Sequence, residues 1–320
     1  MTSTGTISSF ETIIGIDISK DHLDAFELPG RARHRLAQSG TGIRSLVKRV
    51  GLAPSPLVVF EATGPYHRDL EQALGRAGIS FSRVNPARAK AFSKVLGQPA
   101  KTDSLDAAML AALGQSGLAE PTPPLPESLH ELKALETALS ALIADRARLR
   151  TRAHTLVLAL LKRQNTAQVA LLDKQIKALE AEIRCRLDED PDLRRKTEIL
   201  TSIPGIGLRT AHRLICRMPE LGTLSQGQAA SLSGTAPRTR QSGKWRGHAF
   251  VQGGRALVRQ ALYMPALIAA RFNPDMKQIY QRMTKSGKPR KVALAAIMRK
   301  LVCLANTLIK NNRIWTPKPA

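Results

Sequence analysis

The chain has 320 residues and a formal net charge of +24, and it is long enough for two or three domains with buried cores. It has no run of about 18 uninterrupted apolar residues and no secretory-type leader, so we expect a cytoplasmic protein without a membrane span. Cys185, Cys216 and Cys303 form neither a disulfide framework nor a zinc motif, and we expect buried or half-buried free thiols.

The charge is concentrated in the last 120 residues. They hold 21 Lys and Arg against only Glu220 and Asp275, a net charge of +19. An excess of this size is typical of proteins that bind a phosphate backbone. A basic membrane-surface segment is the alternative, but the few aromatic residues and the scattered charges favour nucleic acid.

The first 110 residues predict a mixed α/β domain. ETIIGIDIS, DHLDAFEL and RHRLAQS are three short runs separated by polar turns, which predicts an antiparallel meander. A helix at GIRSLVKRVG, a strand at PLVVFEAT, a helix at HRDLEQALGRAG and a strand at ISFSRVN follow. In such folds the functional sites lie at strand ends.

Four carboxylates occupy positions from which they could converge. Asp17 and Glu61 close two apolar strands, and Asp103 and Asp106 are three residues apart on one helix face. Carboxylates from separate segments can hold two divalent ions about 4 Å apart for phosphodiester chemistry, and Mg²⁺ prefers oxygen ligands. Alternatively, Asp103 caps its helix with Asp106 in the first turn, and Asp17 is a solvated strand-end residue.

Proline-rich EPTPPLPES separates this first domain, residues 1–120, from a helical segment, residues 126–190. Apolar residues at three and four spacing predict two long helices with a weak break near residues 164–166. We expect either an antiparallel pair or a coiled coil with a second copy.

The last domain, residues 195–320, reads as short helices joined by glycine and proline turns. SIPGIG, followed by a helix, resembles the hairpin of helix-hairpin-helix elements, in which glycines approach a DNA phosphate closely. The candidate contacts are Gly205, Gly207 and Arg209, with Arg213 nearby. An ordinary helix-loop-helix turn is the alternative.

APRTRQSGKWRG is basic and contains no acidic residue. Ser242 lies in its turn, where a serine is a turn former or a nucleophile. Trp245 could stack on a base or fill a gap in the core. The expected phosphate contacts are Arg238, Arg240, Lys244 and Arg246.

Taken in order, IGIDISK, FEATGPY, NPARAKAF, KTDSLDAAMLA, SIPGIG, QSGKWRG, RALYMPAL and AAIMRKL resemble the DEDD transposases of bacterial insertion sequences, the one-ten and eleven-eleven groups. The resemblance spans nearly the whole chain. It implies a Holliday-junction-resolvase-like domain of ribonuclease-H fold, a coiled-coil segment and a C-terminal transposase domain. It also implies that Asp17, Glu61, Asp103 and Asp106 bind metal and that Ser242 is the nucleophile.

The resemblance implies a recombinase that excises and inserts its own element. Ser242 would form a transient phosphoserine link with DNA, with Mg²⁺ as cofactor. A structured noncoding RNA would pair with donor and target DNA, and the protein would act as a homo-oligomer, a dimer or a tetramer. Two alternatives remain: a junction-resolving nuclease that uses metal-activated water without Ser242, and a non-catalytic architectural binder of nucleic acid.

Overall fold

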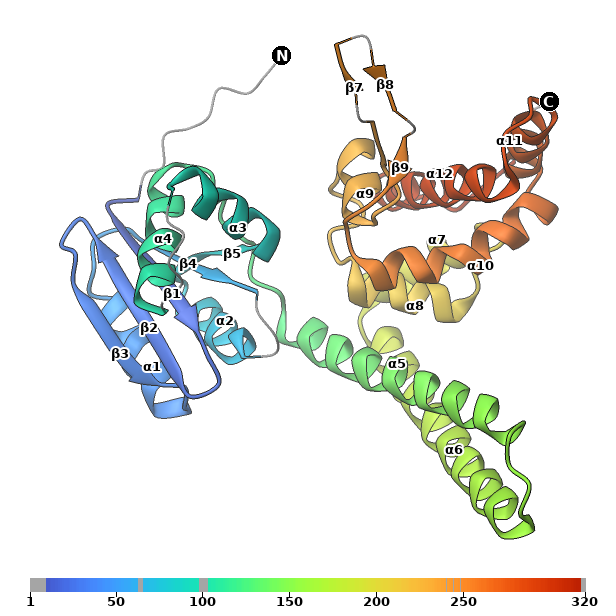
Figure 1. Cartoon of the computed structure of the whole chain (residues 1–320), viewed down its shortest axis with the longest axis horizontal. Coiled ribbons are helices and arrows are strands. Elements are labelled where there is room, and N and C mark those ends of the chain that lie inside the picture. The colour runs from blue at the N-terminus through green and yellow to red at the C-terminus, as the bar shows by residue number, and fades with distance from the viewer. Residues whose placement is uncertain are drawn as a thin grey trace. The chain divides into compact units, whose positions relative to one another are not determined.

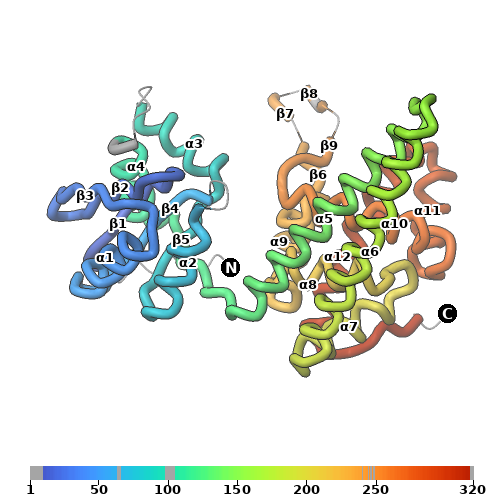
Figure 2. Tube along the Cα trace, turned by 90° about the horizontal axis from the view of Figure 1, so that it is seen from below, coloured from blue at the N-terminus to red at the C-terminus, as the bar shows by residue number. Residues whose placement is uncertain are grey.

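The structure is a computed structural model that describes residues 10–62, 66–97, 103–239, 241–243, 245–247 and 249–317. The chain forms two compact units, Met1–Glu127 and Ser128–Ala320, drawn in Figures 1 and 2. The division falls within the proline-rich segment, where prolines interrupt helix formation. The finer boundaries at residues 120, 126, 190 and 195 stay predictions.

The first unit is built on a five-stranded sheet in the order β3-β2-β1-β4-β5. β1 pairs with β2 and β2 with β3 in antiparallel fashion, whereas β1 pairs with β4 and β4 with β5 in parallel. The predicted meander and the predicted succession of strands and helices along the chain are confirmed. The strands are β1 (Thr12–Ile18), β2 (His22–Leu28), β3 (Arg33–Ala37), β4 (Pro56–Glu61) and β5 (Ser80–Val84).

Helices cover both faces of this sheet. One face packs its apolar side chains on α1 (Gly40–Val50) and α2 (His67–Arg76). The opposite face packs on α4 (Asp103–Gln115), with α3 (Pro86–Val95) beside it. This mixed α/β unit is consistent with a ribonuclease-H-like domain.

α4 lies directly on the central strand because two glycines remove side chains at the crossing. A Cβ on Gly15 of β1 would lie 2.0 Å from the Ala107 carbonyl oxygen and 2.4 Å from the Ala111 nitrogen. A Cβ on Gly114 would lie 2.6 Å from Cγ2 of Ile13. The end of α4 therefore lies over the start of β1, and its beginning lies toward the carboxyl end of that strand.

The second unit begins with two long helices, α5 (Glu127–Ala153) and α6 (Ala159–Glu189). Arg186 of α6 pairs with Glu131 of α5 near one end, and Arg146 of α5 pairs with Asp173 of α6 near the other. The two helices therefore run antiparallel, which is the first of the two predicted arrangements. The break predicted near residues 164–166 is wrong, because the turn falls before Ala159. Thr166 lies inside α6, where its hydroxyl donates to the Lys162 carbonyl at 2.9 Å.

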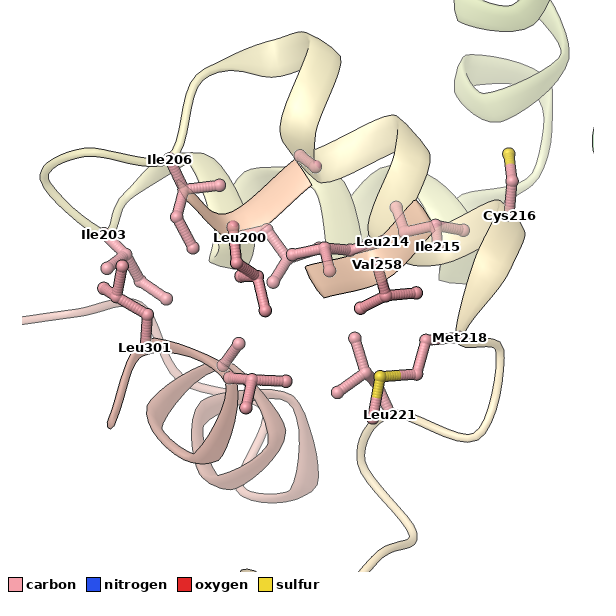
Figure 3. Packing of buried hydrophobic residues seen from close by; sticks show 14 of the residues in the cluster. Leu200, Ile203, Ile206, Leu214, Ile215, Cys216, Met218, Leu221, Val258 and Leu301 are labelled. Atoms are coloured by element: carbon pink, nitrogen blue, oxygen red, sulfur yellow. The ribbon is translucent and has the colours of Figure 1, made fainter. Parts of the chain in front are cut away.

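The remaining helices of this unit enclose one large apolar core (Figure 3), which includes Leu200, Leu214, Val258 and Leu301. They are α7 (Pro191–Thr201), α8 (Leu208–Arg217), α9 (Gln226–Leu232), α10 (Ala256–Phe272), α11 (Pro274–Lys285) and α12 (Arg290–Lys310). Within the described part of the chain, α12 has the length and apolar composition of a membrane span, but 56% of that window is buried. It is a core helix of this unit.

A narrow β-ribbon interrupts the helices between α9 and α10, where the sequence predicted only helices and turns. Its outer part is β7 (Gln241–Ser242) paired with β8 (Trp245–Arg246), and its inner part is β6 (Pro237–Arg238) paired with β9 (Phe250–Val251). Figure 1 shows the ribbon extending away from the helices of its unit.

The three cysteines are free, as predicted, but they differ in exposure. Cys216 is buried, and this burial raises the pKa of its thiol to about 12. Cys303 is half-buried. The prediction that all three are at least half-buried is wrong for Cys185, which is exposed on α6 and donates to Oε1 of Glu189 at 3.4 Å.

Candidate active site

The carboxyl ends of β1 and β4 bring two of the predicted carboxylates to neighbouring positions. Asp17 and Glu61 each follow the last register pair of these parallel strands, Ile16 with Phe60. Side chains alternate along a strand, so Asp17 shares the sheet face of Gly15, which α4 covers. Both carboxylates are half-buried on that face.

A third carboxylate, which sequence reasoning missed, stands in the same row. Asp24 of β2 is directly opposite Asp17, and Arg35 of β3 is directly opposite Asp24. Arg35 donates to both Asp24 oxygens, at 2.8 and 3.0 Å, and the Asp24 side chain is 13% exposed. We call Arg35, Asp24, Asp17 and Glu61 the acidic row. Asp24 could have been found from the sequence only by predicting the pairing register of β1 and β2, which the turn after Ile18 sets.

The other two predicted ligands are at the start of α4. Asp103 is the first residue of the helix, and its side chain lies outside the described residues. Asp106, one turn further on, is half-buried. Because α4 crosses β1 at Gly15 with its beginning toward Asp17, the backbone places this first turn near the acidic row.

The donor set fits magnesium by chemistry, since every member is a carboxylate. Among the side chains that the structure describes, however, no group of three or more His, Cys, Asp or Glu is close enough to hold a metal ion. The strands and the start of α4 converge at one end of the sheet. The four-carboxylate site itself stays a prediction.

Ser242 stands near the tip of the ribbon, far along the chain from the acidic row. It is exposed and in register with Trp245, and Gly243 between them has φ +56°. Trp245 is 59% exposed, so it does not fill a core gap. Arg238 is exposed at the inner part of the ribbon. Arg240, Lys244 and the side chain of Arg246 lie outside the described residues.

The foot of the ribbon is held tightly. Gly234 and Gly254 both have positive φ, and a Cβ on Gly254 would lie 2.2 Å from the Gly234 nitrogen. Arg259 of α10 donates from Nη1 to the Gly253 carbonyl at 2.7 Å. Arg255 donates to Glu220 through both Nη atoms, at 2.6 and 2.7 Å. These contacts anchor the foot of the ribbon that carries Ser242 to α10 and to the rest of the unit.

The predicted DNA-binding hairpin connects α7 and α8. Gly205 has φ +110°, and a Cβ there would lie 2.8 Å from the Pro265 carbonyl of α10, so this glycine is needed for packing inside the unit. Gly207 precedes α8, and its Cβ position is open. Arg209 is 64% exposed and pairs with Glu180 of α6 at 2.5 Å. A DNA contact at this hairpin stays a prediction.

Comparison with known proteins identifies the family. A DEDD transposase model matches residues 14–163, and a second model, described as the IS116/IS110/IS902 transposase family, matches residues 197–281. The pilin gene-inverting protein of Moraxella bovis is 31% identical over 329 residues, which cover 95% of this chain and 97% of that protein. The chain belongs to the IS116/IS110/IS902 family of transposases.

Other relatives agree with this assignment. The pilin gene-inverting protein of Moraxella lacunata is also 31% identical to the transposase over 329 residues. An insertion element IS110 protein of Streptomyces coelicolor is 27% identical over 152 residues, 47% of this chain and 36% of that protein. The resemblance predicted from the motifs is confirmed, and the transposase is an enzyme of DNA recombination.

Proposed function

We propose that this transposase excises and inserts an insertion-sequence element through Ser242, with Mg²⁺ held by Asp17, Glu61, Asp103 and Asp106. One observation carries the proposal. The register places Asp17 and Glu61 side by side at the carboxyl ends of two parallel strands, at the end of the sheet where α4 begins. Converging carboxylates are the donors that divalent-ion phosphodiester chemistry requires.

In the proposed reaction the Oγ of Ser242 attacks a DNA phosphorus atom. An Oγ–P bond forms, the bond from phosphorus to one deoxyribose oxygen breaks, and the serine proton passes to solvent while the departing oxygen takes one up. A DNA hydroxyl later attacks the phosphoserine and releases the serine, so no cofactor is consumed. When bound, Mg²⁺ would stabilise negative charge on the phosphate oxygens.

The exposure of Ser242 supports this role, because a nucleophile that meets a duplex phosphate must stand clear of its own fold. The acidic row and Ser242 would have to act on the same phosphate, within one chain or between copies of a dimer or tetramer. Because the last 120 residues carry a net charge of +19, we further propose that donor DNA, target DNA and a structured noncoding guide RNA bind there. Such an enzyme works in the cytoplasm, on the nucleoid.

The test uses full-length protein, element-end DNA, Mg²⁺ and RNA transcribed from the element's flank. Denaturing gels of labelled DNA measure the protein–DNA adduct. We expect Ser242→Ala to abolish the adduct and recombination, and Asp17→Asn to abolish both as well. The matched controls are Ser231→Ala and Asp69→Asn, which change exposed residues of α9 and α2, and these variants should behave as the parent does. Omitting the RNA should stop recombination if it is the guide.

A junction-type nuclease that uses water is the second candidate, because all four proposed metal ligands belong to the first unit and none to the ribbon. In that case Ser242→Ala still cleaves DNA whereas Asp17→Asn does not. A purely architectural binder is the third, and recombination unaffected by either substitution would exclude both catalytic roles.

A further inference from the structure

An open pocket of ≈ 630 Å³ lies beside the foot of the ribbon, between α10 and α12. Thr235 lies at the foot of the ribbon and Val251 in its strand β9. Tyr263 comes from α10, and Lys291 comes from α12. Pockets of about 300–1,000 Å³ are the usual size for a small organic ligand. The pocket thus lies next to the ribbon that carries Ser242. Its volume is large enough for a small organic ligand.

The charge of the pocket favours an anion. Among the residues that the structure describes, Arg259 and Lys291 line it and no acidic residue does. Arg259 uses Nη1 to hold the Gly253 carbonyl at 2.7 Å, and a guanidinium has further N–H groups that can donate to a phosphate. Glu220 is one of only two acidic residues among the last 120 residues, and it is paired with Arg255 outside the pocket.

The rest of the lining suits a flat apolar group with polar edges. The buried residues Leu294 and Met298 contribute apolar surface, and Tyr263, which also lines the pocket, is 46% exposed. Gln260, also in the lining, carries an amide that both donates and accepts. An aromatic ring, an amide and two cations are the groups that proteins use to bind an unstacked nucleotide.

We infer that this pocket binds a single unpaired nucleotide of the DNA strand on which the transposase acts. Tyr263 stacks on the base, Gln260 contacts its edge, and Lys291 and Arg259 contact the adjoining phosphate. A paired base cannot enter, because its neighbours in the stack occupy both of its faces. An extruded base regains in the pocket the stacking that it loses in the duplex. This inference rests on the action of the transposase on DNA and is independent of the role proposed for Ser242.

The probes are two 20-base-pair DNA duplexes, one fully paired and one with a single unpaired 2-aminopurine. Competition binding to full-length protein gives the ratio of the two affinities, and 2-aminopurine fluorescence reports stacking. We expect the parent protein to prefer the unpaired site by about tenfold, within the range for one base–aromatic stack, and to quench its fluorescence. Tyr263→Ala should bring the affinity ratio to about one and abolish the quenching.

Five further variants make the result specific. Tyr263→Phe keeps the ring and should keep the preference. Phe272→Ala removes an exposed aromatic residue of α10 that does not line the pocket, and it should also keep the preference. Lys291→Gln should weaken binding of the unpaired duplex several-fold, whereas Lys277→Gln on α11 should not. Ser242→Ala should retain both preference and quenching, which separates this test from that of the nucleophile.

Equal affinity of the parent for both duplexes would overturn the inference, as would an equal loss in Phe272→Ala and Tyr263→Ala. A stronger preference for the same unpaired site in an RNA duplex would overturn the assignment to DNA. If Tyr263→Ala unfolds, the quenching in the parent and the several-fold weaker binding of the unpaired duplex by Lys291→Gln decide the question.

Discussion

Gly15 shows how one missing side chain positions a candidate site. α4 can cross β1 only because no Cβ stands between them, and that crossing sets where Asp103 and Asp106 begin their helix. Gly15→Ala would place a methyl 2.0 Å from the Ala107 carbonyl, and neither backbone can yield without moving α4. We expect a loss of about 3 kcal/mol in the free energy of unfolding, together with a loss of DNA cleavage.

Urea unfolding and the adduct assay measure these two effects. Gly30→Ala is the control, because no atom lies within 4 Å of its Cβ position and its φ is not in the left-handed region. Unchanged stability in Gly15→Ala would mean that α4 does not pack on β1 as described.

At the scale of elements, α5 and α8 are joined by a buried charge cluster. The side chain of Glu136 is 2% exposed and accepts from Arg213 at 2.8 Å, from Ser140 at 2.8 Å and from Arg217. Glu136→Gln would leave the half-buried guanidinium groups of Arg213 and Arg217 without the buried carboxylate that they share. Removing one partner of a buried pair costs about 3–5 kcal/mol, which thermal or urea unfolding can resolve. Glu131→Gln, at the exposed pair with Arg186, should cost under about 1 kcal/mol.

His212 on α8 makes the stability of this region depend on pH. Burial lowers its pKa below the ordinary 6.5, and Arg184 adds to this, whereas Asp188 and Glu180 oppose it. The unfolded chain therefore binds the proton more tightly. The contribution of neutral His212 is fully present above pH 6.5 and is lost as the pH falls through the folded-state pKa. Urea unfolding between pH 5 and 8 should show this loss.

His212→Gln should flatten that part of the profile. His154→Gln, at an exposed position before α6, should leave the profile as it is in the parent. A parent profile that rises toward pH 5 would contradict the burial of a neutral imidazole.

The elements that could be predicted are those with strong local patterns. The short runs of β1 and β2 between polar turns and the continuous apolar run of β4 indicated the strands. Asp17 and Glu61 were predictable because strand ends meet at a sheet edge. Asp24 was not, because its place in the row depends on pairing register, which no local pattern encodes. The ribbon was missed because its strands are two residues long, too short for any alternation to be visible.

At the scale of the molecule, charge separates the two units. Residues 1–127 contain 14 basic and 12 acidic residues, whereas residues 128–320 contain 35 and 13. We expect DNA affinity to fall steeply with salt, with the logarithmic slope reduced by about 0.9 for each phosphate contact removed. Lys288→Gln combined with Arg290→Gln, exposed before and at the start of α12, should reduce the slope.

Fluorescence anisotropy across salt concentrations measures that slope. The matched control is Lys174→Gln combined with Arg184→Gln, which removes the same charge from exposed positions on α6. An equal reduction by both double variants would show that only net charge matters, and not where on the second unit it lies.

The acidic row also links folding accuracy to chemistry. Because successive side chains of a strand point to opposite faces, a slip of β1 by one residue would carry Asp17 among the apolar side chains that contact α1 and α2, and would expel Ile16 from them. Such a slipped chain would lose the position of its candidate metal-binding carboxylates and its core in the same step. A chain whose β1 is mispaired therefore cannot also have a well-packed core. Every correctly packed copy of this unit consequently has these carboxylates in the same positions.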